Sequence, residues 1–260
     1  MRFLKKYLLP IALVLVVVCS GFFVWISGKY VVPIMMYHNV DYTDVLKPNT
    51  VSPQNFERQM AYLKEHGFNV LSFENLVRLI SENRKIPRKS VVITFDDGYA
   101  DNYTHAFKIL KKYGFPAIVF MPSDLVGRDG HLTWPQLREM TEHGIAIGSH
   151  TRLHAYLPDL SLEQQREEIF GSKRVLEAQL GVPVKYFAYP IGGFSNAIKE
   201  IIRQAGYQGA AATNRGYDRF NKDVFELNRV RFSDKDNRDD YLWMKLSGAY
   251  NIFRKAKHPY

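Results

Sequence analysis

The stretch that decides the fold is residues 91–98, which read Val-Val-Ile-Thr-Phe-Asp-Asp-Gly. Its first five residues are apolar or β-branched, which is typical of a strand buried on both faces of a parallel sheet. Two adjacent carboxylates, Asp96 and Asp97, follow this run and precede Gly98. Because chemistry in parallel α/β folds gathers where the strands end, the stretch indicates both a fold class and the place of a functional site.

Strand-like and helix-like patterns alternate on both sides of this stretch. We expect strands at 31–37, 69–72, 91–95, 116–121, 145–148, 185–189, 207–212 and 225–232, and helices at 55–66, 74–82, 101–113, 134–143, 161–180 and 195–204. Such alternation predicts a parallel α/β architecture. About seven strand–helix units over ~200 residues favour a barrel, with an open sheet as the alternative that periodicity alone does not exclude.

The N-terminal segment predicts a membrane anchor. Residues 7–28 carry no charge, and Arg2, Lys5 and Lys6 precede them. This length suits a membrane-spanning helix, and the basic flank favours a cytoplasmic N-terminus. We expect an uncleaved single-pass anchor in residues 1–30, with its helix at about 8–27, and an extracytoplasmic catalytic domain in 31–232. A cleaved signal peptide, which would leave the domain secreted, is the alternative. Residues 233–260 have no predicted role.

Composition narrows the function classes. The 260 residues are 46% hydrophobic and 23% charged, as in ordinary globular proteins. A single cysteine, Cys19, excludes a disulfide framework and a cysteine-built zinc site. The net charge is +9, but residues 1–30 hold four basic residues and no acidic ones, leaving 31 basic against 26 acidic residues. Nucleic acid is therefore not an expected partner.

The Asp96–Asp97 pair is the first candidate for chemistry. Adjacent carboxylates repel each other, and their protonation is coupled unless a cation binds one of them. A metal would take one carboxylate as a ligand and leave the other free as a base. A solvated turn is an equally good interpretation of the pair alone, because Asp-Gly is common in turns.

A second candidate, Ser149-His150-Thr151-Arg152-Leu153-His154, follows the predicted strand at 145–148. Imidazoles four residues apart suit a metal, although two surface histidines would be the better explanation of the pair alone. The segment lacks the glutamate of a zincin peptidase. Two histidines and one carboxylate form a facial set that leaves positions open for water and substrate.

A third candidate is the turn at residues 189–195, which read Tyr-Pro-Ile-Gly-Gly-Phe-Ser. It leads from a predicted strand into a predicted helix. Such turns bring backbone N–H groups close to a ligand, which suits stabilisation of an oxyanion. A plain strand–helix connection is the commoner explanation of such a turn alone.

Together and in this order, the three segments resemble the NodB-homology polysaccharide deacetylases, carbohydrate esterase family four, over about residues 33–232. The resemblance implies a distorted (β/α)7 barrel and a divalent metal, Zn²⁺ in most members, with Co²⁺ or Ni²⁺ as alternatives. It implies hydrolysis of N- or O-acetyl groups on glycans.

The resemblance also assigns roles to residues. It implies that Asp97, His150 and His154 are the metal ligands and that Asp96 is the general base for the attacking water. It places the backbone oxyanion donor at Ile191, where the family usually has tyrosine.

Two departures from the family pattern bear on the site. Members usually carry an arginine in the third motif that orients the base aspartate, but Ala188 stands there. Arg229 and Arg231 on the last predicted strand are the candidate replacements. Many members also carry a late Leu-x-His that supplies the general acid, and residues 226–231 contain no histidine.

His38 is the candidate for the missing acid. It follows the first predicted strand, which neighbours the last strand in a closed barrel. The arrangement resembles the circularly permuted subgroup that includes poly-β-1,6-N-acetylglucosamine deacetylases, whose early Tyr-His segment provides the acid. Histidine has the near-neutral pKa that protonation of a departing amine requires. Packing at the strand end is the competing role.

These features predict a membrane-anchored, metal-dependent deacetylase of an N-acetylated extracellular polysaccharide resembling poly-N-acetylglucosamine. Alternatives within enzymes are a peptidoglycan N-acetylglucosamine deacetylase and an O-acetyl-xylan-type esterase. A glycan-binding barrel without activity is the non-enzyme alternative, and a binding module would not need both the metal set and the base. A non-haem iron oxygenase shares the two-histidine, one-carboxylate set and would require redox-active iron.

Overall fold

The computed structural model describes residues 2–27, 30–42, 48–255 and 257–259. Its centre is a curled sheet of parallel strands in the order β10–β1–β5–β6–β7–β8–β9, with β4 paired to the start of β5. The strands are β1 (Ile34–Tyr37), β4 (Asn69–Val70), β5 (Ser90–Asp96), β6 (Ala117–Met121), β7 (Ile145–Ser149), β8 (Tyr186–Ala188), β9 (Gly209–Ala211) and β10 (Val230–Arg231). A small parallel pair, β2 (Asn39–Val40) and β3 (Thr50–Val51), follows β1.

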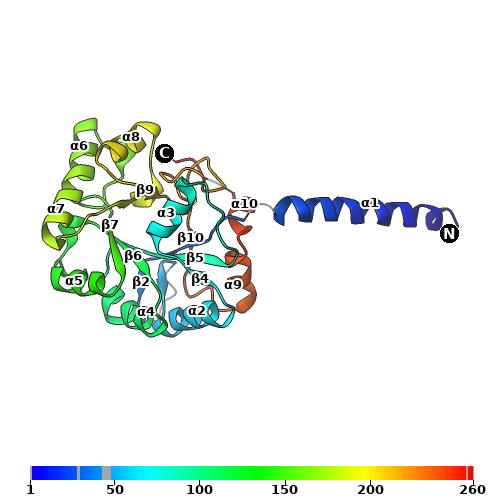
Figure 1. Cartoon of the computed structure of the whole chain (residues 1–260), viewed down its shortest axis with the longest axis horizontal. Coiled ribbons are helices and arrows are strands. Elements are labelled where there is room, and N and C mark those ends of the chain that lie inside the picture. The colour runs from blue at the N-terminus through cyan, green and yellow to red at the C-terminus, as the bar shows by residue number, and fades with distance from the viewer. Residues whose placement is uncertain (1, 28–29, 43–47, 256, 260) are drawn as a thin grey trace.

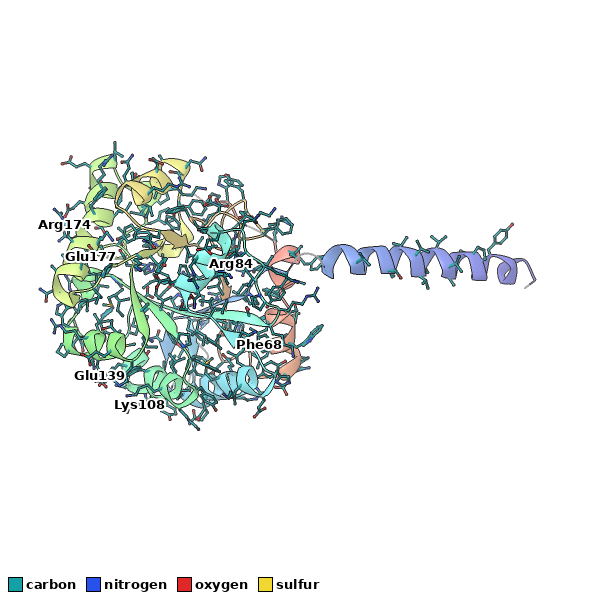
Figure 2. The ribbon with its side chains drawn as sticks, in the orientation of Figure 1. Phe68, Arg84, Lys108, Glu139, Arg174 and Glu177 are labelled. Carbon is teal, nitrogen blue, oxygen red and sulfur yellow. The ribbon has the colours of Figure 1, made fainter. Side chains whose placement is uncertain are left out.

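Helices ring the outside of this sheet (Figure 1). They are α2 (Pro53–Glu65), α4 (Lys108–Tyr113), α5 (Trp134–Glu142), α6 (Leu162–Arg166), α7 (Ser172–Leu180), α8 (Asn196–Gln204), α9 (Asp239–Leu246) and α10 (Tyr250–Phe253). Figure 2 shows charged side chains of these helices, such as Lys108 and Arg174, at the periphery of the domain, and both are exposed. The charged faces therefore meet solvent and the apolar faces meet the sheet.

Side-chain alternation along the strands creates two cores. In β5, Val91, Ile93 and Phe95 pack in the outer core under the helices, and Val92 packs inside the curl. The inner core is closed by α3 (Phe73–Ser81), whose Phe73 ring lies 5.5 Å from that of Phe120. Apolar side chains such as Ile34, Val92 and Ile118 fill the interior of the curl, whereas the last residue of β5 is the buried, polar Asp96.

The predicted parallel α/β architecture is confirmed, but the predicted barrel is only a curled half-barrel, because the two ends of its strand order meet only through an irregular segment. Before β10, residues 224–229 run beside β9, where Ala212 N–H donates to the Leu227 carbonyl at 2.9 Å. The chain then crosses to β1, and Met36 pairs with Arg231. The predicted strand at 225–232 is therefore shorter than expected, because its first part pairs irregularly with a different neighbour from its last part.

The predicted helices differ from the observed ones mainly in their regularity. The predicted helix at 101–113 begins as a π-helical segment, Asn102–Phe107, and the predicted helix at 161–180 contains another, Glu167–Gly171. The capping box that opens the second helix is present, since Ser161 N–H donates to Gln164 Oε1 at 3.0 Å and Gln164 N–H donates to Ser161 Oγ at 3.3 Å.

The N-terminal helix α1 (Arg2–Ser27) extends away from the rest of the chain (Figure 1). Among the described residues, no helix combines the length and the apolar character needed to cross a bilayer. The predicted membrane anchor at about 8–27 is therefore not supported.

Candidate active site

A cavity of about 320 Å³ lies at the carboxyl ends of the parallel strands. Segments far apart in the sequence meet there, at the ends of β1, β5, β7 and β10 and in the turn after β8. Seven of the residues singled out in the sequence line this one cavity, namely His38, Asp96, Asp97, His150, His154, Ile191 and Arg231. The eighth, Arg229, is fully buried and hydrogen-bonded to Asp96.

The end of β5 directs its two carboxylates differently. Asp96 continues the inward alternation of Val92, so its carboxylate enters the interior of the curl. Asp97 leaves the strand with φ +68°, in the left-handed region. Gly98 follows with φ +63°, and a Cβ there would lie 1.9 Å from Met121 Sδ. Glycine is therefore required by both the backbone conformation and the close approach of Met121.

Asp96 and Arg229 form a buried two-point ion pair. Arg229 Nη1 and Nη2 donate to Asp96 Oδ1 and Oδ2 at 2.6 and 2.7 Å. The guanidinium is held in turn by Nε donation to the Ala212 carbonyl at 2.8 Å and by Nη1 donation to Thr94 Oγ1 at 3.1 Å. Burial raises the pKa of Asp96, but the charge and the hydrogen bonds of Arg229 outweigh it and lower that pKa to about 2. Asp96 is therefore ionised and fixed in orientation.

Of the two arginines that the sequence offered, Arg229 lies against Asp96 and Arg231 does not. Arg229 and Arg231 are two positions apart, so their side chains point to the same side of the extended chain. Arg231 pairs with Met36 of β1, and both residues line the cavity. Arg229 lies two residues earlier and reaches the buried carboxylate, whereas Arg231 Nη1 donates to Asn49 Oδ1 at 2.9 Å. The strand register thus determines which guanidinium fills the position left by Ala188.

Asp97, His150 and His154 form a compact donor set. Asp97 Oδ1 lies 3.5 Å from His150 Nε2 and 3.3 Å from His154 Nε2. One donor atom from each residue lies within 4.8 Å of the other two. Asp97 Oδ1 is buried and has no hydrogen-bond partner among the described residues. An orphaned carboxylate oxygen between two imidazole nitrogens is the arrangement that a bound divalent cation would satisfy.

The protonation of His150 also suits a cation. Its Nδ1 lies 2.7 Å from the Ala188 carbonyl and donates to it, which leaves the Nε2 lone pair facing Asp97. Burial lowers the pKa of His150 to about 4, so the ring is neutral. The donor set fits zinc or a similar divalent ion, whose identity depends on more than these three side chains.

Backbone strain gathers at this site. Asp97, Thr151, His154 and Ile191 all have positive φ, between +58° and +68°. Such conformations are unfavourable for residues other than glycine, and most of all for the β-branched Thr151 and Ile191. The first three are in or beside the donor set, where the unusual backbone turns its side chains toward one another.

Two acidic residues that support the site belong to no motif in the sequence. Glu168 Oε2 accepts hydrogen bonds from the N–H groups of Arg152 and Leu153 at 2.7 and 3.1 Å, which holds the loop between the two histidines. Asp101 Oδ1 accepts from Val40 N–H at 3.0 Å, just beyond His38. Both act across long sequence separations on backbone groups, which no local motif records.

His38 lies at the end of β1 with its ring in the cavity. Its carbonyl accepts a hydrogen bond from Asn102 Nδ2 at 2.7 Å, and its Nδ1 is buried without a partner among the described residues. Burial lowers the pKa of His38, and the carboxylates of Asp96 and Asp97 oppose that shift. The pairing of β1 with β10 places His38 beside the strand on which the family's late histidine is missing.

Ile191 lies in a tight turn after β8, and its backbone has φ +58°. The side chain is 55% exposed although it is large and apolar. Gly192 follows with φ +78°, and a Cβ there would lie 2.3 Å from Thr213 Oγ1. The backbone geometry of the turn therefore holds the Ile191 peptide at the cavity wall. The isoleucine side chain is mostly exposed and does not pack in the core.

The described residues of the C-terminal segment, 233–255 and 257–259, pack on the domain and reach the cavity, although the sequence predicts no role for them. Leu242 and Leu246 of α9 are buried in the outer core. Lys257 N–H donates to the Asn214 carbonyl at 2.9 Å, so this segment pairs with the loop after β9. Arg254 and Lys257 line the cavity. The cavity wall is therefore completed by the last described residues of the chain.

Comparisons with known proteins agree with this geometry. The family model described as polysaccharide deacetylase matches residues 83–210. The chain is 35% identical over 201 residues to YxkH of Bacillus subtilis, provisionally named a polysaccharide deacetylase, covering 77% of this chain and 71% of YxkH. It is 30% identical over 177 residues to the poly-β-1,6-N-acetyl-D-glucosamine N-deacetylase of Staphylococcus epidermidis, covering 63% of this chain and 61% of that protein.

Solved structures give the same result. The deacetylase PplD of Streptococcus pyogenes, in complex with acetate, has a TM-score of 0.77 and 30% identity, covering 84% of this chain and 99% of that one. IcaB from Ammonifex degensii has a TM-score of 0.72 and 26% identity, covering 86% and 97%. The chain spans only 18% of the length of the Escherichia coli poly-β-1,6-N-acetyl-D-glucosamine N-deacetylase that it also matches.

Proposed function

Because this chain belongs to the polysaccharide deacetylase family and is of the NodB type, we propose that it removes N-acetyl groups from an extracellular glycan built on N-acetylglucosamine. The observation that carries the proposal is the meeting, in one cavity, of the Asp97–His150–His154 donor set, the Asp96–Arg229 pair and His38. A binding module would have no use for an ionised base beside a donor set.

Asp97, His150 and His154 are the residues that would hold the divalent cation. When bound, such a cation polarises an acetyl carbonyl and lowers the pKa of water toward neutrality. His150 contributes a neutral ring whose Nε2 is kept available by the hydrogen bond from Nδ1 to Ala188. The partial exposure of Asp97 and His154 leaves this side of the donor set accessible from the cavity.

Asp96 is proposed to accept the proton of the attacking water. Arg229 binds both of its oxygens, which fixes the plane of the carboxylate and leaves each oxygen a further lone pair. A pKa of about 2 keeps the group ionised throughout the neutral range. So weak a base removes a proton effectively only from an acidified water, which ties its action to the neighbouring donor set.

Two groups are proposed to act on the substrate as the amide breaks. The backbone N–H of Ile191 donates to the developing oxyanion. His38, in its protonated form, gives a proton to the departing amine. Burial lowers the pKa of His38, which makes the imidazolium a stronger acid, and the carboxylates of Asp96 and Asp97 favour its charged form.

Acetate release tests the proposal. Purified protein is incubated with poly-β-1,6-N-acetylglucosamine, chitooligosaccharide or peptidoglycan in the presence of Zn²⁺, Co²⁺ or Ni²⁺, with Asp97→Ala as the matched inactive control. Acetate is expected from at least one glycan and from the wild type only. Acetylated xylan is incubated as a fourth substrate, and acetate from it and from none of the three N-acetylated glycans would instead assign an esterase.

The extracytoplasmic location of the catalytic domain stays a prediction. A polymeric cell-surface glycan would be accessible only on that side. Digestion of intact cells with an added protease is expected to remove the domain, and protection equal to that of a cytoplasmic marker would contradict the location.

A further inference from the structure

One wall of the catalytic cavity is strongly basic. Arg215, Arg231, Arg254 and Lys257, here called the cationic rim, line it together with the site residues. They come from the loop after β9, from β10 and from the segment beyond α10. Arg231 and Lys257 are exposed, and the other two are half-buried. The rim therefore faces the space that substrate must enter.

No member of the cationic rim pairs with a carboxylate among the described residues. Their guanidinium groups donate only to neutral oxygens: Arg215 to the His258 carbonyl at 3.0 Å, Arg231 to Asn49 Oδ1 at 2.9 Å, and Arg254 to the Arg229 carbonyl at 2.8 Å. Neighbouring buried cations differ, because Lys245 pairs with Asp236 at 2.5 Å and Lys199 pairs with Glu226 at 2.7 Å. These two buried lysines have counter-charges, whereas the cationic rim has none among the described residues.

The acidic residues of the cavity do not offset the rim. Asp96 is already neutralised by Arg229, and Asp97 would be neutralised by the cation that it helps to bind. Burial lowers the pKa of Arg254, and the positive charge of Arg231 lowers it further. Like charges that repel one another across a cavity favour a ligand that brings negative charge.

We propose that the cationic rim binds an anionic group, a phosphate diester or a carboxylate, carried by the glycan beside the acetylated sugar. The inference rests on the proposed function and narrows its substrate to an acidic polymer. A neutral N-acetylglucosamine chain would leave four cations without counter-charge. Guanidinium groups match the two-oxygen geometry of phosphate and carboxylate, and a cleft of one sign attracts oppositely charged ligands from solution.

Matched oligosaccharides test the inference. The probes are a chitooligosaccharide, which is neutral, a hyaluronan oligosaccharide, in which N-acetylglucosamine alternates with a carboxylate sugar, and an N-acetylglucosamine oligosaccharide bearing a phosphodiester. We expect at least one acidic probe to have the higher kcat/KM at low salt. The preference should shrink as ionic strength rises, since screening weakens exposed charges. Whichever acidic probe is preferred identifies the anion.

Substitutions in the cationic rim test whether it causes the preference for acidic probes. Lys257→Gln and Arg231→Gln are each expected to lower the ratio of acidic to neutral kcat/KM about tenfold, the scale of one charge-assisted hydrogen bond. Lys235→Gln, an exposed lysine of the same segment outside the cavity, is the matched control and should leave the ratio unchanged. A ratio that the rim variants do not move would overturn the inference.

The two proposals fail in different ways. Cleavage of neutral and acidic probes with equal kcat/KM would overturn the rim inference and leave the deacetylase function standing. If no probe releases acetate, calorimetric titration of the same probes into the protein still tests whether the cationic rim binds an anionic group. A tighter, salt-sensitive affinity for an acidic probe would support it, and equal affinities would refute it.

Discussion

The buried pair between Asp96 and Arg229 makes a quantitative prediction about stability. In Arg229→Met the Asp96 carboxylate would stay 3% exposed and lose both hydrogen bonds of 2.6 and 2.7 Å. Removing one partner of a buried pair costs about 3–5 kcal/mol, because the other charge is left uncompensated. For a domain of this size we expect the Tm to fall by about 6–20 °C.

The pH dependence has a definite sign. The folded pKa of Asp96 is about 2, below the ~3.9 of an unfolded aspartate. A carboxyl group with a lowered pKa stabilises the fold above its unfolded pKa and loses that contribution as pH falls toward the folded pKa. About 2–3 kcal/mol is therefore present at neutral pH and lost between about pH 5 and pH 2. In Arg229→Met this loss on acidification should be absent or reversed.

Urea unfolding followed by circular dichroism, with a chelator present so that bound metal does not contribute, measures the free energy of unfolding. Arg231→Met, a change at an exposed arginine two residues away, is the control and should change it by no more than about 0.5 kcal/mol. The double variant Asp96→Leu, Arg229→Met should recover most of the loss, because it leaves no buried charge. A loss below about 1 kcal/mol in Arg229→Met, or no recovery in the double variant, would refute the reasoning.

Three further predictions concern the site. His150→Ala should abolish the rise in Tm that zinc produces, measured by calorimetry. In the wild type, zinc at a hundred times its dissociation constant stabilises the fold by about 2.7 kcal/mol. An equal rise in Tm in both proteins would exclude His150 as a ligand. His38→Ala should keep that zinc-dependent rise but lower kcat for acetate release about 10²–10⁴-fold, and unchanged kcat would show that another group is the acid. Ile191→Asn should raise the free energy of unfolding by about 1 kcal/mol, because asparagine tolerates positive φ better than isoleucine does. Its kcat should be retained, because the backbone N–H remains. A loss of stability in urea unfolding would show that the isoleucine conformation is not strained.

Much of the fold could be predicted because its signals are local. The buried run at 91–95 became β5, and the predicted helix at 161–180 begins at a capping box between Ser161 and Gln164. The two π-helical segments were not predicted, since an extra residue in a helical turn leaves the apolar period almost unchanged. The last strand was overestimated because residues 224–229 pair with β9, a long-range choice that β-branched composition does not encode.

The candidate site likewise consists of residues that local motifs predicted and of contacts that depend on long-range packing. Asp96, Asp97, His150 and His154 were found through motifs, but the sequence left two arginines as partners for Asp96. Only the register of β10 against β1 distinguishes them, and register depends on neighbours nearly two hundred positions away. The part played by residues 254 and 257 was missed for a similar reason, because their contacts follow from packing and not from any pattern in the segment itself.

The strand order has a consequence for how the chain is made. β1 lies between β5 and β10, so one of its edges is covered early in synthesis and the other only after every other strand of the sheet has left the ribosome. Until then Ile34–Tyr37 presents an apolar strand with an open edge, a template on which nascent chains associate. The proposed acid His38 follows this strand directly, so its position in the cavity is complete only once β10, the last strand of the sheet to be made, has paired with β1.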